Sequence, residues 1–195
     1  MGGMSTINRQ LAILLAKHRE IEVTLLVPKF SCSEEDRRTA WNHNVLIKEA
    51  EKRPGFDPLD WLSFPPKDLI IDVILGHGAQ LGKQAQVIRE SHNCQWVQVV
   101  HTAPEELGMF KTHPRAVAKG ELKTTTEVDL CKLADLVVAI GPKLAEAYSA
   151  YLRPCQKQQD ILKLTPGTFK EFSALIQDPV DLGNFRVLTF GRGDP

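Results

Sequence analysis

Two histidines lie at the ends of apolar runs that have the composition of buried strands. His77 comes just after DLIIDVIL, residues 68–75, and His101 follows QWVQVV, residues 95–100. Histidine is the side chain whose charge changes closest to neutral pH, so it can exchange protons and bind polar ligands. Taken alone, each histidine is also explained as a strand end bonded to a backbone carbonyl. Because two of them at adjacent strand ends would share one cleft, we expect His77 and His101 to face a ligand.

A glycine pair, Gly2-Gly3, directly precedes a helical pattern. Glycine lets backbone amides approach an anion, and the helix N-terminus adds partial positive charge, so the pair is able to bind a phosphate. Glycines before helices are also common without any ligand. The segments that follow the predicted strands also carry a glycine or a histidine, which supports a ligand-binding role for the pair. These are Gly76-His77-Gly78, His101-Thr102-Ala103-Pro104 and Gly141-Pro142-Lys143.

The segment GHGAQLGKQ, residues 76–84, matches neither of two nucleotide-binding motifs. A phosphate loop needs glycine at the position of His77 and Ser or Thr at the position of Gln84. The dinucleotide motif G-x-G-x-x-G fails because its third glycine comes one residue late. We therefore expect neither nucleotide hydrolysis nor nicotinamide binding.

A metal site is not expected either. No three histidines have metal-ligand spacing, and the four cysteines form no C-x-x-C pair. Cys131 lies on an apolar helical face and is predicted to be a core residue. Without a secretory segment, these cysteines indicate a reduced, cytoplasmic protein.

The elements that must position these residues alternate along the chain. Continuous apolar strands, each followed by a helix, predict an α/β fold, a doubly wound, mostly parallel sheet with helices on both faces. Helices are expected at 5–18, 33–52, 78–91 and 124–133 and from Pro142, and strands at 22–27, 68–75, 95–100, 134–140, 160–169 and 185–190.

Composition is consistent with a globular domain. The 195 residues are 43% hydrophobic and 25% charged, and 24 Lys and Arg balance 24 Asp and Glu. This balance gives no support for nucleic-acid or membrane partners through bulk charge. No apolar run approaches the roughly 18 residues of a membrane span.

Five segments, in order, resemble the N-terminal domain of retaining GT-B glycosyltransferases, closest to the group of sucrose-phosphate synthase and the mycothiol glycosyltransferase. GGMSTINRQLAILLAKHREIEVTLLVP is similar to the glycine loop, first helix and second strand of that family. DVILGHGAQLG and VVHTAPEELGMFK resemble its two histidine-bearing loops. EVDLCKLADLVVAIGPKL is similar to its glutamate, Ala-Asp and following strand, and RVLTFGRGD to the start of its second domain. Glu127 stands seven residues before Ala134, as in the family, where this glutamate is structural.

The resemblance implies how a donor would be bound. Gly2 and Gly3 would present amides to the diphosphate of a nucleotide-diphosphate sugar, and Arg192 would contact the same phosphates. Loop amides and basic side chains would stabilise the departing diphosphate, so neither a metal nor another cofactor is required.

The resemblance also implies a reaction centre. His101 is the implied catalytic residue, beside the transferred sugar. Lys111 would bind an acceptor phosphate, although it lies four residues farther from His101 than in the family. The further ligand-binding residues are His77, Gly78 and Thr102.

The domain boundaries depart from the family. Residues 1–184 correspond to one GT-B half, and 185–195 to the start of a missing second domain or to a strand added to the sheet. The strand expected before Gly2 is missing too, which leaves an open sheet through which two chains could pair as a dimer. We expect the acceptor-side domain of a glycosyltransferase, inactive in isolation. The alternative is a ligand-sensing or interaction module of a larger signalling protein, which binds nucleotide sugars or sugar phosphates without transfer.

Overall fold

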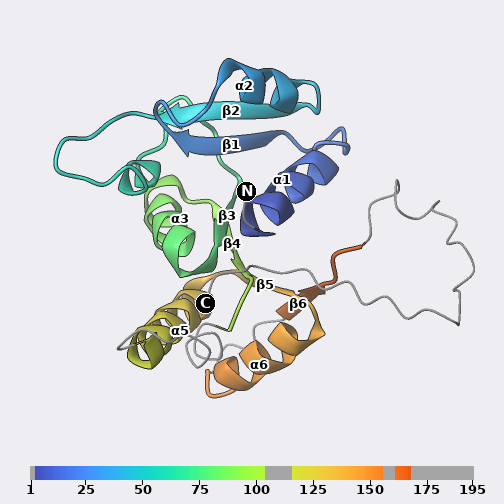
Figure 1. Ribbon diagram of the computed structural model, residues 1–195, viewed down its shortest axis with the longest axis vertical. Helices are drawn as coiled ribbons and strands as arrows, with labels where there is room; N and C mark the ends of the chain where they lie inside the picture. Colours follow the sequence, from blue (N-terminus) through green and yellow to red (C-terminus); the bar gives the residue numbers. More distant parts are fainter. Residues whose placement is uncertain (1–2, 104–115, 156–160, 168–195) are drawn as a thin grey trace, which may run out of the picture.

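A computed structural model describes residues 3–103, 116–155 and 161–167 (Figure 1). The chain begins with helix α1 and then alternates strands and helices. The helices are α1 (Gly3–Leu15), α2 (Glu34–Trp41), η1 (Asp60–Ser63, a 3₁₀ helix), α3 (Gly78–His92), α5 (Ala116–Leu133) and α6 (Pro142–Leu152). The strands are β1 (Val23–Pro28), β2 (Val45–Ala50), β3 (Val73–His77), β4 (Gln95–Val100), β5 (Leu136–Ile140) and β6 (Ile161–Leu164).

Every strand pair among the described residues is parallel, which confirms the predicted α/β class. The described strands form two sheets rather than one, however. A two-stranded sheet has the order β1-β2, and a four-stranded sheet has the order β3-β4-β5-β6. In the larger sheet Val73 pairs with Gln95 and Val97 with Leu136, so the carboxyl ends of β3 and β4 lie side by side.

The helix predicted over 33–52 is wrong in its second half. Helix α2 begins at a capping box, in which the side chains of Ser33 and Asp36 each accept a hydrogen bond from the other residue's backbone amide. The helix has only 8 residues and ends at Trp41. Asn44 then adopts a left-handed conformation (φ 59°), which asparagine tolerates and a helix does not. The residues that follow form β2 and pair with β1 in register from Val23↔Val45. Val45 and Ala50 are buried, and this burial in the sheet outweighs the local helical pattern.

Two further element starts differ clearly from expectation. Strand β3 begins at Val73, not at residue 68, and α5 begins at Ala116, not near Thr124. The predicted strand 185–190 lies outside the described residues, as does the whole 185–195 segment. None of the described helices is both long and apolar enough to cross a membrane.

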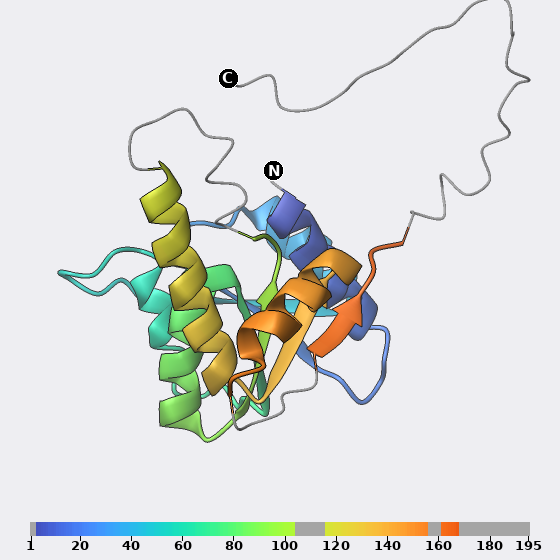
Figure 2. The same ribbon diagram turned by 90° about the horizontal axis from the view of Figure 1, so that it is seen from below.

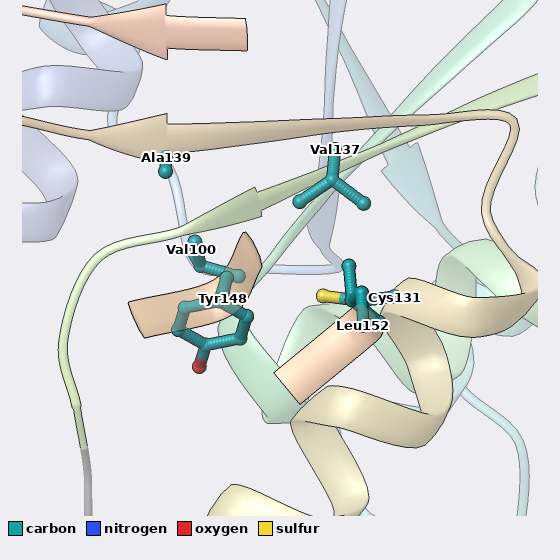
Figure 3. Close-up of a cluster of buried hydrophobic side chains, with 6 residues drawn as sticks. All are labelled: Val100, Cys131, Val137, Ala139, Tyr148 and Leu152. Atoms are coloured by element: carbon teal, nitrogen blue, oxygen red, sulfur yellow. The ribbon is translucent and has the colours of Figure 1, made fainter. Parts of the chain in front are cut away.

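The larger sheet has its main core between its strands and helices α5 and α6. Six buried residues from β4, α5, β5 and α6 meet there (Figure 3): Val100, Cys131, Val137, Ala139, Tyr148 and Leu152. Cys131 is fully buried, as predicted. Since helices return antiparallel to the strands, α1 and α5 begin on the side of the molecule where β4 ends (Figure 2).

Candidate functional site

The two predicted histidines contact each other at the carboxyl ends of β3 and β4. His77 Nδ1 lies 2.9 Å from His101 Nε2, and the ring centroids are 5.1 Å apart. His77 is the last residue of β3, and its side chain is only 3% exposed. His101 follows the last residue of β4 and is half-buried. The parallel pairing of β3 with β4 therefore brings together residues 24 positions apart in the chain.

Both imidazoles are neutral at pH 7. Burial, together with the neighbouring His101, lowers the pKa of His77 to about 4. Burial also lowers the pKa of His101. In a contact between two neutral rings, one ring nitrogen donates a proton and the other accepts it. The pair is thus a neutral, hydrogen-bonded unit rather than a positively charged one.

His101 keeps one ring nitrogen without a partner. Its Nδ1 atom is buried and forms no hydrogen bond with any described residue. An unpaired buried polar atom is costly, so a group that bonds it, such as a ligand hydroxyl, would lower the free energy of the site. Within the described ranges, His101 bonds the ring of His77 and no backbone carbonyl.

A buried glutamine in β4 positions the end of β3. Gln98 is fully buried, and its Nε2 donates to the carbonyl oxygen of Gly78 at 2.8 Å. Gly78 has φ 63°, a left-handed conformation that favours glycine at the sharp turn from β3 into α3. The amide of Gln98 thereby holds the turn that carries His77.

A second set of contacts holds the turn after β4. Tyr148 in α6 is fully buried, and its hydroxyl lies 3.5 Å from the carbonyl oxygen of Thr102. Glu127 in α5 is buried as well, and burial raises the pKa of its carboxyl group to about 7.

A cleft of about 730 Å³ opens beside α3, α5 and the segment before η1. It reaches Ala79, two residues beyond His77. Its lining includes three lysines, Lys83, Lys119 and Lys123, and two aspartates, Asp57 and Asp60. None of these lysines forms an ion pair with a described residue.

The floor of this cleft includes a buried glutamine, Gln84. Its Nε2 donates to Asp60 Oδ1 at 3.2 Å, while its Oε1 has no partner among the described residues. The cleft therefore offers cations, carboxylates and one unpaired amide oxygen to a ligand.

The structure brings some of the predicted site residues together, whereas others lie outside the described residues. His77, Gly78, His101 and Thr102 lie together at the ends of β3 and β4. Gly3 begins α1, on the side where β4 ends (Figure 2). Gly2, Lys111 and Arg192 lie outside the described residues, so their predicted roles stay predictions.

Sequence reasoning missed Gln98 and the lysine cleft. Gln98 had a visible signal, because a glutamine inside the apolar run QWVQVV must find a partner if the strand is buried. Lys119 and Lys123 are four residues apart and so share a helix face, but their meeting with Lys83 depends on how α3 packs against α5. Among the described residues no cluster of His, Cys, Asp or Glu could hold a metal ion.

Parallel strands, returning helices and polar residues at the carboxyl edge define a Rossmann-like α/β domain. Residues 1–195 match the family described as family 4 glycosyltransferase in conflict systems, and the chain belongs to that family. No curated protein matches the chain.

Proposed function

We propose that this domain is the acceptor-side half of a retaining glycosyltransferase that uses a nucleotide-diphosphate sugar, as in the sucrose-phosphate synthase and mycothiol glycosyltransferase group. One observation supports the proposal above others. The neutral His101 stands at the end of β4 with its Nε2 2.9 Å from His77 Nδ1, and its own buried Nδ1 has no partner among the described residues. Membership in a glycosyltransferase family supports the same reading.

The neutrality of His101 suits the chemistry of sugar transfer. Positive charge develops on the sugar ring as the diphosphate leaves, so an imidazolium beside the ring would oppose the reaction. Burial lowers the pKa of His101 and so keeps the ring uncharged. A neutral ring can bond a sugar hydroxyl through Nδ1 and hold the sugar in place.

The donor diphosphate would bind at the start of α1. Backbone amides at Gly2 and Gly3 and the helix N-terminus would stabilise the negative charge of the leaving group. Arg192 would contact the same phosphates. This arrangement requires neither a metal nor another cofactor.

We assign the lysine cleft to the acceptor. Its lysines fit an anionic group such as a phosphate, and its aspartates accept hydrogen bonds from hydroxyl groups. A sugar or polyol that carries a phosphate combines both features. Lys111 would add a further cation to the same acceptor. We further propose that the domain alone transfers little sugar, because the other half of a GT-B enzyme holds the donor nucleotide.

The test is a transfer assay on the whole protein that carries this domain. Labelled nucleotide sugars are supplied with sugar phosphates as acceptors, and His101→Ala is expected to lower transfer at least 100-fold. His43→Ala, a change at an exposed histidine, is the matched control and should be neutral. Lys123→Ala should raise KM for the phosphorylated acceptor and leave kcat nearly unchanged.

Full transfer by the His101→Ala variant would show that His101 has no role in the reaction. Calorimetry on the domain alone distinguishes a transferase from the alternative, a ligand-sensing module. Tight binding of a nucleotide sugar by the domain, with no transfer by the whole protein, would favour the sensing module.

A further inference from the structure

A second groove lies between α2 and the outer strand of the smaller sheet. Among the described residues β2 pairs with β1 alone, so the backbone groups along its other edge bond no described strand. Strand β2 lies on the side of β1 that is away from the larger sheet, with α2 beside it (Figure 1). The groove has a volume of about 430 Å³ and shares no lining residue with the lysine cleft. It is therefore separate from the site assigned to sugar transfer.

The strand side of this groove is apolar. Its lining comes from the first three residues of β2, Val45, Leu46 and Ile47, and charged residues follow only at Lys48 and Glu49. Charged side chains commonly protect an edge strand from pairing with another chain. The first half of β2 has no such protection, so it is suited to contact with another polypeptide.

The helix side of the groove carries an exposed tryptophan. Trp41 is 68% exposed and lines the groove at the end of α2. Tryptophan is enriched among the residues that dominate protein interfaces, because its rigid side chain buries a large area at low cost in conformational entropy. An exposed indole beside an apolar groove is therefore the anchor expected of an interface.

The charges of α2 favour a second copy of this chain as the partner. The groove-lining residues of α2 are three or four positions apart and so share one helix face: Glu34, Arg37, Arg38 and Trp41. The acidic residues of α2 all precede its basic residues. When two such helices lie antiparallel, the acidic turn of each faces the basic turn of the other. A two-fold axis produces this arrangement, since it brings the same surface of both protomers into contact.

Two charges on this helix face are suited to contacts between protomers. Arg37 is held within its own chain, because its Nη2 lies 2.7 Å from Glu49 Oε1. Glu34 has only a long contact of 3.7 Å with Arg37, and its side chain is 96% exposed. Arg38 is exposed and forms no ion pair within the described part of the chain. The acid and the base are one helical turn apart, so a two-fold axis between them pairs each with its opposite.

We propose that α2 and the first half of β2 form the interface of a symmetric dimer of this chain. Glu34 of each protomer pairs with Arg38 of the other, and each Trp41 packs against the apolar strand residues of the opposite groove. The proposal concerns assembly and stands whether or not the domain transfers sugar.

Sedimentation velocity of the whole chain at increasing concentration tests the proposal. The wild type should form a dimer and nothing larger, because a two-fold contact closes on itself. Trp41→Ala should weaken association about 100-fold, since two anchors are lost at once. Ile70→Ala removes a side chain that is 88% exposed and lies outside the groove, and it should dimerise as the wild type does. A wild type that stays monomeric at every concentration, or a Trp41→Ala dimer as tight as the wild type, would overturn the proposal.

A charge exchange tests the predicted pairing. Glu34→Arg and Arg38→Glu should each weaken self-association about tenfold, because like charges then face each other at two symmetry-related places. An equal mixture of the two variants should associate as the wild type does, since the mixed dimer sets opposite charges together at both places. Glu35→Arg, a change at an exposed glutamate of α2 that does not line the groove, is the control and should leave association unchanged. If the mixture associates no better than the separate variants, the pairing of Glu34 with Arg38 is wrong.

Discussion

The chemistry of single residues in this domain is governed by burial. His77 and Glu127 are buried and His101 is half-buried, so each favours its uncharged form. The pKa of His77 is lowered to about 4 and that of Glu127 is raised to about 7, so their contributions to stability change with pH in opposite directions. His77 destabilises the fold in acid, whereas the fold loses stability through Glu127 as the pH rises from 4.5 to 7.

Removing the titration of His77 should weaken the acid sensitivity of the fold. Between pH 6.5 and 4 the unfolded chain binds a proton at this histidine and the folded chain does not. Stability from His77 is therefore present above pH 6.5 and is lost as the pH falls through 4, by about 3 kcal/mol in total. Urea unfolding of His77→Gln should show a loss between pH 7 and pH 4 that is smaller by about this amount.

The comparison of His77→Gln with the wild type cancels the opposing contribution of Glu127, which both proteins share. It also tolerates a change in absolute stability, because only the pH dependence is compared. His43→Gln, at an exposed histidine, should retain the wild-type pH dependence. If His77→Gln loses as much stability in acid as the wild type, the buried neutral state of His77 is refuted.

At the scale of elements, close packing between β3 and α3 positions the site. Gly76 and Gly82 bring the strand and helix together over the buried side chain of Gln98. The sequence allowed prediction of this strand–helix unit and of the strand-end histidines, because apolar runs and polar ends are local patterns. It did not allow prediction of β2, since residues 45–50 have a helical pattern that only pairing with β1 overrides. The lysine cleft was missed for the same reason, because it arises from contact between separate helices.

Gly76→Ala should separate β3 from α3. A Cβ atom at this position would lie 2.9 Å from Ala85 Cβ and 3.0 Å from the Cα of Gly82, and neither of these atoms can rotate away. We expect a loss of about 1–3 kcal/mol in the free energy of unfolding, the usual cost of overpacking. Chemical denaturation measures this loss. Gly167→Ala is the control, because a Cβ there would meet nothing within 4 Å, and equal stability of the two variants would contradict the packing argument.

At the scale of the whole molecule, the two sheets are joined through side chains rather than through strand pairing between β1 and β3. The buried residues Ala50, Trp61 and Leu62 form a cluster at η1. Leu26 of β1 packs against this cluster from the smaller sheet. Leu81 of α3 packs against it from the larger one. The coupling of the two sheets, and hence of the β1-β2 unit to the histidine site, is therefore expected to depend on this cluster.

Trp61→Ala should uncouple the two sheets. Trp61 is 8% exposed, and its indole Nε1 also donates to the carbonyl of Phe56 at 3.0 Å. Removal of such a side chain costs about 3–5 kcal/mol, and the loss should fall mainly on the smaller sheet. Amide hydrogen exchange should become fast in β1 and β2 while β4 and β5 stay protected. Trp41→Ala, at a tryptophan that is 68% exposed, should leave both sheets protected. Uniform loss of protection across all strands in Trp61→Ala would instead mean that the two sheets unfold as one cooperative unit, with no weaker part at β1-β2.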